Sequence, residues 1–154
     1  MKKRRSLWIY ASLFFATFMV DRFTKALILW WGVSKVCITS FLSLHLSFNR
    51  GISWGMLHSD RTGPFIAVTL LSLVIIIPLA IHTYFRWRRG FSVWGETLAM
   101  SGALSNLFDR ILYGGVLDFI SFAYGNWYWP IFNIADVCIV SGVFLILITF
   151  SREG

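Results

Sequence analysis

The chain has 154 residues, of which 57% are hydrophobic, 18% aromatic and only 14% charged. Soluble domains usually contain about 45–50% apolar and roughly 25% charged residues. A water-soluble enzyme, a disordered segment and a nucleic-acid-binding protein are therefore poor matches, even though the net charge is +7. At about 20 apolar residues per bilayer crossing, this length allows about four spans and no separate soluble domain.

Four apolar stretches are long enough to be membrane spans, and they make residues 1–154 a single integral-membrane domain. We predict spans at about 7–31, 64–85, 93–112 and 131–150. The first follows four basic residues, as a secretory signal does. No small residues at A-x-A spacing follow its apolar run, so we expect an uncleaved anchor.

Basic residues near the span ends predict the orientation of the chain. Three basic residues lie between the first and second spans, in segment 32–63 on one side of the membrane: Lys35, Arg50 and Arg61. The other side holds Lys2, Lys3, Arg4, Arg5, Arg86, Arg88, Arg89 and Arg152. We therefore expect both termini in the cytoplasm and segments 32–63 and 113–130 facing outward.

The two outward segments contain partly alternating runs rich in Val, Ile, Thr and aromatic residues, which is typical of short strands. We expect them to form a small sheet at the membrane surface. Cys37 lies in the first of these segments and Cys138 in the fourth span, so a disulfide is not expected. No Cys or His spacing indicates a metal site.

Ionisable side chains within spans are costly and are candidates for function. With one exception, the strongly polar residues of the spans fall in the outer leaflet. These are Asp21, Lys25, Asn106, Asp109, Arg110, Asn133 and Asp136. Independent snorkelling from each helix end would give this distribution, but one shared polar site explains it better. The exception, Glu96, is expected to pair with the basic loop at 86–89.

Helical spacing supports a shared site. Gly102, Asn106, Arg110 and Tyr113 are four, four and three residues apart and so line one helix face. A buried Arg110 would need an anionic partner. Asp109 should point away from that face, in a supporting or interfacial role.

Asp21 and Lys25 are four residues apart, so a structural ion pair is one interpretation of them. Two further aspartates stand beside apolar residues: Asp118 in VLDFI after the third span, and Asp136 in FNIADVCI early in the fourth. If these segments adjoin, the two carboxylates would share a proton, as in aspartic proteases. A proton relay or ion site would use the same residues, so a small proton- or ion-conducting transporter is the alternative. A purely structural membrane subunit is a third possibility.

Four motifs in this order resemble the bacterial lipoprotein signal peptidase (signal peptidase II) family: VDRFTK (20–25), FNRGISWG (48–55), SGALSNLFDRILYGGVLDFI (101–120) and FNIADVCI (132–139). The resemblance implies an inner-membrane aspartic endopeptidase that removes signal peptides from diacylglyceryl-modified prolipoproteins and is inhibited by globomycin. It implies four transmembrane helices with a small periplasmic sheet and a short helix, and an active site at the outer leaflet. No metal or cofactor is expected; prolipoprotein and membrane lipid are the expected partners of a monomer.

Carried over by position, the resemblance implies that Asp118 and Asp136 are catalytic and that Asn133 orients them. Residues expected to line the substrate pocket or support the pair are Asn49, Gly51, Gly102, Asn106 and Arg110, with Asp21 and Lys25 as a stabilising pair nearby. Three positions depart from the family pattern. Ser101 and Ser105 replace glycines, and Trp54 replaces a smaller aromatic residue. The resemblance therefore does not define the exact shape of the pocket.

Overall fold

The structure, a computed structural model, describes residues 7–32, 34–51 and 62–153. Within these ranges the helices are α1 (Leu7–Trp31), α2 (Thr62–Arg88), α3 (Trp94–Tyr113) and α4 (Ile134–Glu153). The four strands are β1 (Lys35–Cys37), β2 (Leu42–Asn49), β3 (Val116–Tyr124) and β4 (Trp127–Tyr128). The chain is therefore mainly helical with one small sheet, as the composition and the loop patterns predicted.

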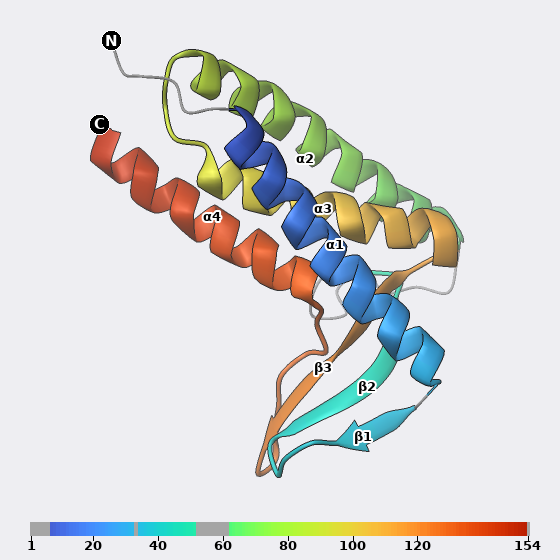
Figure 1. The fold of residues 1–154 in the computed structure, drawn as a ribbon. Coiled ribbons are helices and arrows are strands. Elements are labelled where there is room, and N and C mark those ends of the chain that lie inside the picture. The colour runs from blue at the N-terminus through green and yellow to red at the C-terminus, as the bar shows by residue number, and fades with distance from the viewer. Residues whose placement is uncertain (1–6, 33, 52–61, 154) are drawn as a thin grey trace.

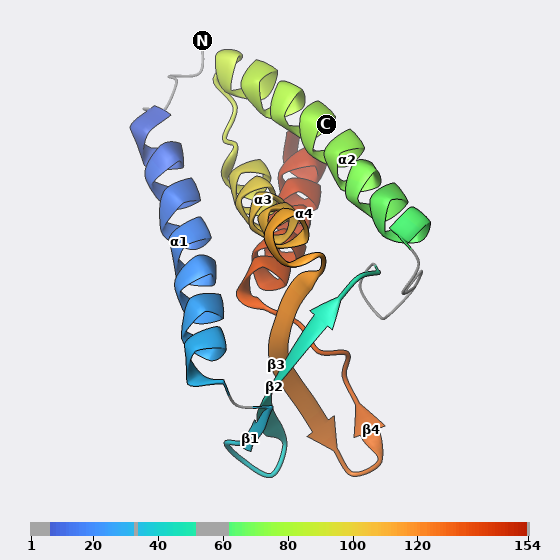
Figure 2. The same ribbon diagram turned by 90° about the vertical axis from the view of Figure 1, so that its right-hand side faces the viewer.

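The helices form a bundle in which α3 packs against α1, α2 and α4. The sheet projects from one end of this bundle, and α1 begins and α4 ends at the opposite end (Figures 1 and 2). At that opposite end the Arg86 Nε atom lies 2.8 Å from a carboxylate oxygen of Glu96. The predicted pairing of Glu96 with the basic loop is thus confirmed.

Two helices among the described residues are long and apolar enough to cross a membrane, namely α2 and residues Ile134–Ser151 of α4. Most of their apolar side chains are exposed, among them Val74 and Ile77 on α2 and Val140 and Phe144 on α4. Such a surface would be unfavourable in water but suits contact with lipid. The helices α1 and α3 carry most of the buried charged groups.

The described parts of segments 32–63 and 113–130 form one antiparallel sheet in the order β1–β2–β3–β4, which confirms the predicted sheet. In the β2–β3 pairing, Ser47 lies opposite Asp118 and Asn49 opposite Val116, with an irregularity between Leu44 and Ser47. This register brings the end of β2 beside Asp118. The described parts of the two segments contain no short helix; Trp54 and the rest of 52–61 lie outside the described residues.

A left-handed residue connects α3 to the sheet. Gly114 has φ +68° and its N–H donates to the Arg110 carbonyl at 3.2 Å, which ends the helix. Asp118 therefore stands on strand β3 rather than at a helix exit. Around it, Leu117 and Phe119 pack with Ile28 of α1 in a buried apolar cluster.

The fourth helix begins three residues later than the predicted span. Phe132 exchanges backbone hydrogen bonds with Ile120 of β3, with N···O distances of 3.0 and 2.8 Å, so this part of the chain is extended. The helix starts only after Asn133, and Asp136 consequently falls in its first turn.

Candidate active site

Asp118 and Asp136 reach one cavity from different elements. Asp118 comes from β3 and is 4% exposed, and Asp136 comes from the first turn of α4. Both line a cavity of about 570 Å³. Two carboxylates separated in sequence by strand, loop and helix are thus brought to a common space, as the sequence predicted.

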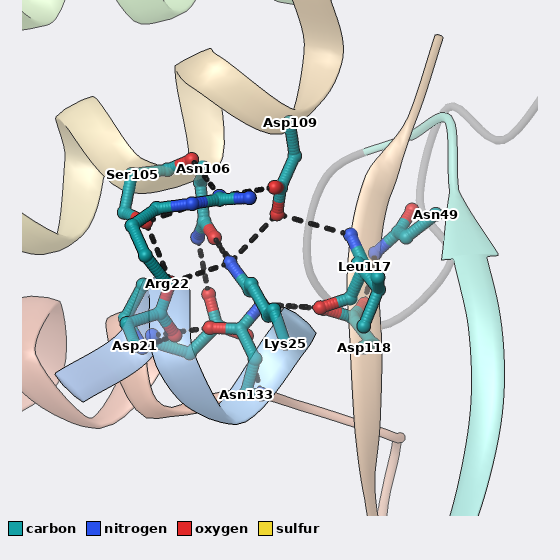
Figure 3. A network of polar contacts seen from close by, with 12 residues as sticks. Asp21, Arg22, Lys25, Asn49, Ser105, Asn106, Asp109, Leu117, Asp118 and Asn133 are labelled. Atoms are coloured by element: carbon teal, nitrogen blue, oxygen red, sulfur yellow. Dashed lines mark hydrogen bonds and ion pairs between the residues drawn. The ribbon is translucent and has the colours of Figure 1, made fainter. Parts of the chain in front are cut away.

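Two side-chain amides hold the carboxylate of Asp118 (Figure 3). Asn133 Nδ2 donates to one oxygen at 2.6 Å, and Asn49 Nδ2 from the neighbouring strand donates to the other at 3.2 Å. Asn49 in turn accepts from the Gly51 N–H at 2.9 Å. The end of β2 therefore contributes directly to the surroundings of Asp118.

The carboxylate of Asp136 also accepts two N–H groups. Asn106 Nδ2 donates to it at 2.8 Å and the backbone N–H of Asn133 at 3.2 Å. The Asn133 side-chain oxygen accepts in return from the Asp136 N–H at 2.9 Å. These reciprocal bonds form a capping box at the start of α4, with Asp136 at its third helical position.

The pKa of Asp118, which lies outside the helices, is raised from 3.8 to about 7. Burial is the largest cause, because it penalises the charged form, and the negative charge of Asp136 adds to it. Hydrogen bonds from Asn49 and Asn133 and the charge of Lys25 act in the opposite direction. Asp118 is therefore protonated to a substantial extent at neutral pH.

Arg110 differs from expectation in its partners. Its guanidinium donates to two backbone carbonyls, that of Gly51 at 2.5 Å and that of Arg50 at 3.4 Å. The ion pairs of the described residues do not include Arg110. The anionic groups near it are Asp118, Asp136 and Asp109, which attract it without direct contact, and its hydrogen-bond partners are loop carbonyls. Arg110 lines the cavity while it ties residues 50–51 to α3.

The cavity has a polar end and a long apolar wall. The polar end holds Asn49, Asn106, Arg110, Asp118 and Asp136. The wall is formed mainly by α2 and α4, through Val68, Leu71, Ile75, Ile76, Val137 and Val140. This arrangement suits a ligand with one polar group and an extended apolar part.

Two members of the predicted α3 face lie outside the cavity lining. Gly102 packs against α4, where an added Cβ would collide with the Ala135 carbonyl and come within 2.9 Å of Ile139. It therefore supports the position of Asp136 through packing. Tyr113 is exposed and its ring lies 6.2 Å from that of Phe48.

Of the two roles predicted for Asp109, supporting or interfacial, the structure favours the supporting one. Asp109 is fully buried rather than interfacial, because α1 supplies two cations to it. Lys25 Nζ lies 2.7 Å from one oxygen, and Arg22 pairs with the other. The prediction had omitted Arg22, although its spacing of three residues from Lys25 indicates a shared helix side.

The two serines that depart from the family pattern have specific contacts. Ser105 Oγ donates to Asp21 at 2.6 Å, and Ser101 Oγ lies 2.7 Å from Thr17 Oγ1. Both serines are buried between α1 and α3. They form hydrogen bonds between these helices, and neither serine lines the cavity.

No group of three or more His, Cys, Asp or Glu residues is placed to hold a metal ion within the part of the chain that the structure describes. Cys37 and Cys138 are both free thiols. The cavity is lined by two carboxylates, two side-chain amides, one guanidinium and the hydroxyls of Ser72 and Ser141. Asn133 lies behind this lining and donates to both carboxylates.

Comparison with known proteins points in one direction. The sequence model of a family described as Signal peptidase (SPase) II matches residues 13–152. The chain is 33% identical to the lipoprotein signal peptidase of Aquifex aeolicus, over 96% of this chain and 88% of that protein. It is 38% identical to the lipoprotein signal peptidase of Clostridium acetobutylicum, over 84% and 85% of the two chains.

Solved structures give a similar result. A bacterial membrane enzyme determined at 2.3 Å by the in meso method superposes with a TM-score of 0.78 at 27% identity. The match covers 99% of this chain and 93% of that one. A second bacterial membrane enzyme, at 1.9 Å, gives a TM-score of 0.74 at 27% identity, over 100% and 99% of the two chains.

Proposed function

The chain belongs to the signal peptidase II family, and we propose that it is an intramembrane aspartic endopeptidase of diacylglyceryl-modified prolipoproteins. It cleaves the signal peptide on the N-terminal side of the lipidated cysteine. The observation that carries this proposal is that Asp118 and Asp136 line one cavity and both accept hydrogen bonds from Asn133.

In the proposed reaction the two carboxylates hold one proton between them. Asp118 carries that proton, consistent with its pKa of about 7. In this scheme Asp136 serves as the ionised partner, because Asn106 and the backbone N–H of Asn133 donate hydrogen bonds to its carboxylate. Asp136 takes a proton from water, the oxygen attacks the scissile carbonyl carbon, and Asp118 gives its proton to the carbonyl oxygen.

The tetrahedral diol then collapses. Asp136 passes its proton to the leaving nitrogen, the C–N bond breaks, and Asp118 regains a proton from a diol hydroxyl. The products are a carboxylic acid on the signal peptide and a free amine on the lipidated cysteine. Both carboxylates return to their initial state, so one water is consumed per bond cleaved.

The apolar wall of the cavity supports a lipid-modified peptide as the substrate. Residues of α2 and α4 line it, and both helices also expose apolar side chains on their outer surfaces. A substrate with acyl chains and an apolar signal segment would remain in a hydrophobic setting on entry. The polar end would receive the peptide bond to be cut.

We further propose that all four helices cross the inner membrane, with the sheet on the periplasmic side. For α1, Trp8 and Trp30 are 81% and 84% exposed, and a rise of 1.5 Å per residue separates them by roughly 33 Å. That separation matches a hydrocarbon core of about 30 Å, whose interfaces favour tryptophan. Arg86 and Arg88 lie in the last turn of α2, at the end of the bundle opposite the sheet (Figure 1). Basic residues are enriched on the cytoplasmic side, so they support a cytoplasmic position for that end.

We also propose that the enzyme works as a monomer. The test is incubation of the purified full-length protein in detergent with a synthetic diacylated prolipoprotein, followed by mass spectrometry. The wild type should release the signal peptide, whereas Asp118→Asn and Asp136→Asn should release none.

Glu96→Gln is the matched control, because it changes another buried carboxylate to an amide at the far end of the bundle. It should cleave as the wild type does. Full cleavage by either aspartate variant would overturn the dyad, and absence of cleavage by the folded wild type would overturn the substrate class. Proton uptake into liposomes without cleavage would favour the transporter alternative.

A further inference from the structure

Each of the two cavity aspartates follows a residue whose backbone N–H is held by another buried carboxylate. The Ala135 N–H, just before Asp136, donates to Asp21 at 2.8 Å. The Leu117 N–H, just before Asp118, donates to Asp109 at 3.2 Å. Asp21 lies on α1 and Asp109 on α3. Each cavity aspartate is therefore held to the helix bundle by a hydrogen bond from the preceding backbone N–H to a buried carboxylate.

Lys25 joins these two anchors (Figure 3). Its Nζ atom lies 2.8 Å from Asp21 and 2.7 Å from Asp109. It also donates to the side-chain oxygen of Asn106 at 3.0 Å. An ammonium group has three donors, and here each has an acceptor. The side chain is fully buried, so no water competes for these contacts.

The bond to Asn106 determines which way that amide points. Lys25 can only donate, so the oxygen of Asn106 must face it and the nitrogen must face away. The nitrogen then donates to Asp136 at 2.8 Å. Asn133 Nδ2, which lies 3.2 Å from the same Asn106 oxygen, favours the same orientation.

The charges around Lys25 are balanced. Asp21 and Asp109 are two carboxylates, and Lys25 and Arg22 are two cations, with Arg22 paired to Asp109. Buried charges persist where they are paired and hydrogen-bonded. A balanced cluster can hold the ammonium group in a fixed place beside the cavity.

We propose that Lys25 is a positioning residue for peptide cleavage: through Asp21 and Asp109 it sets the separation of Asp136 and Asp118, and through Asn106 it orients the donor to Asp136. This inference rests on the proposed function. It differs from a purely structural ion pair because the step it predicts to fail is the chemical step. Small displacements of reacting groups can lower rates on the order of a hundredfold.

The test is the double variant Lys25→Met/Asp21→Asn in the full-length protein. It removes one cation and one anion, so the Arg22–Asp109 pair stays balanced. The amide introduced by Asp21→Asn retains an oxygen for the Ala135 N–H and a polar group for Ser105, which preserves the anchor at α4. What is lost is the link from Asp21 to Asp109 and the donor to Asn106.

We expect kcat for a diacylated prolipoprotein to fall on the order of a hundredfold, with KM nearly unchanged. The charged groups that face Asp118 are Asp136 of α4, Lys25 of α1 and Arg110 of α3. The positive charge of Lys25 lowers the pKa of Asp118. Its loss should therefore move the basic limb of the pH–rate profile to higher pH.

The control is Arg86→Met/Glu96→Gln, which removes a second buried ion pair at the opposite end of the bundle. It should keep the wild-type kcat and pH profile per folded molecule, even if its Tm falls. An unchanged kcat and pH profile in Lys25→Met/Asp21→Asn would overturn the inference, as would an equal loss in the control. In either case cleavage by the wild type would leave the proposed function intact.

Discussion

Asn133 Nδ2 lies 2.6 Å from the carboxylate of Asp118, although one residue precedes a helix and the other stands on a strand. The backbone N–H and side-chain oxygen of Asn133 are meanwhile engaged with Asp136 in the capping box of α4. One residue therefore has two separable tasks. It starts the helix that carries Asp136, and it holds Asp118 beside that helix.

Substitution of Asn133 should separate these tasks. Both Asn133→Ser and Asn133→Ala lose the side-chain amide, but serine is as good an N-cap as asparagine, so Asn133→Ala should be about 1 kcal/mol less stable than Asn133→Ser. Neither variant has the donor to Asp118, whose carboxylate becomes charged when it gives up its proton, and a hydrogen bond to a charged group contributes about 1.5–3 kcal/mol. We expect both to lose roughly ten- to a hundredfold in kcat. Thermal unfolding and cleavage assays test this, and wild-type kcat in Asn133→Ser would contradict it.

The pH dependence of cleavage should report the proton on Asp118. The proposed acid must be protonated, and its pKa is about 7. Above that value kcat/KM should fall by about tenfold per pH unit, because the protonated form is lost. Since the two carboxylates titrate as a pair, the limb belongs to the pair in the free enzyme. Initial rates between about pH 5 and 9 measure this, and a flat profile across neutrality would exclude Asp118 as the acid.

The meeting of Asp118 and Asp136 at one cavity was predictable because local features of the sequence single out each residue. Asp118 and Asp136 each stand among apolar residues, and a carboxylate in such a segment is costly unless it has a use. The spacing of Asn133 and Asp136 indicated a common helix side. The same spacing matches a capping box, which would have placed the start of α4 three residues after the predicted start of the fourth span.

The roles of Asp109 and Arg22 were not predictable in the same way. Periodicity along α3 places Asp109 beside Arg110 on a different face, and it does not reveal that α1 packs there with two cations. The partner of Arg110 was missed for a related reason. Backbone carbonyls of Arg50 and Gly51 leave no signature in side-chain composition. Contacts between helices, and between a helix and a loop backbone, depend on packing that a single sequence does not display.

The stability of the protein should reveal that Asp118 is poorly solvated. Its folded-state pKa is above the ordinary value of 3.8, so the unfolded chain releases this proton first as the pH rises. Stability is then lost between about pH 4 and 7, and the full penalty remains above that range. The amide of the Asp118→Asn variant does not ionise and escapes the penalty. The Tm of Asp118→Asn relative to wild type should therefore rise from about pH 4 to about pH 8. At the upper end the gain in the free energy of unfolding should be on the order of a few kcal/mol. A pH-independent difference in Tm would contradict this.

Close packing of α3 on α4 should be as necessary for Asp136 as its hydrogen bonds. A Cβ on residue 102 would overlap the Ala135 carbonyl and approach Ile139 to 2.9 Å, and Ala135 immediately precedes Asp136. Overpacking of this kind costs about 1–3 kcal/mol, so Gly102→Ala should lower both the Tm and kcat by displacing the start of α4. Gly63→Ala is the matched control, because a Cβ there meets nothing within 4 Å. Alanine is the better helix former by about 1 kcal/mol, so this control should keep full activity and lose no stability. Equal behaviour of the two variants in unfolding and cleavage assays would show that the α3–α4 contact does not position Asp136.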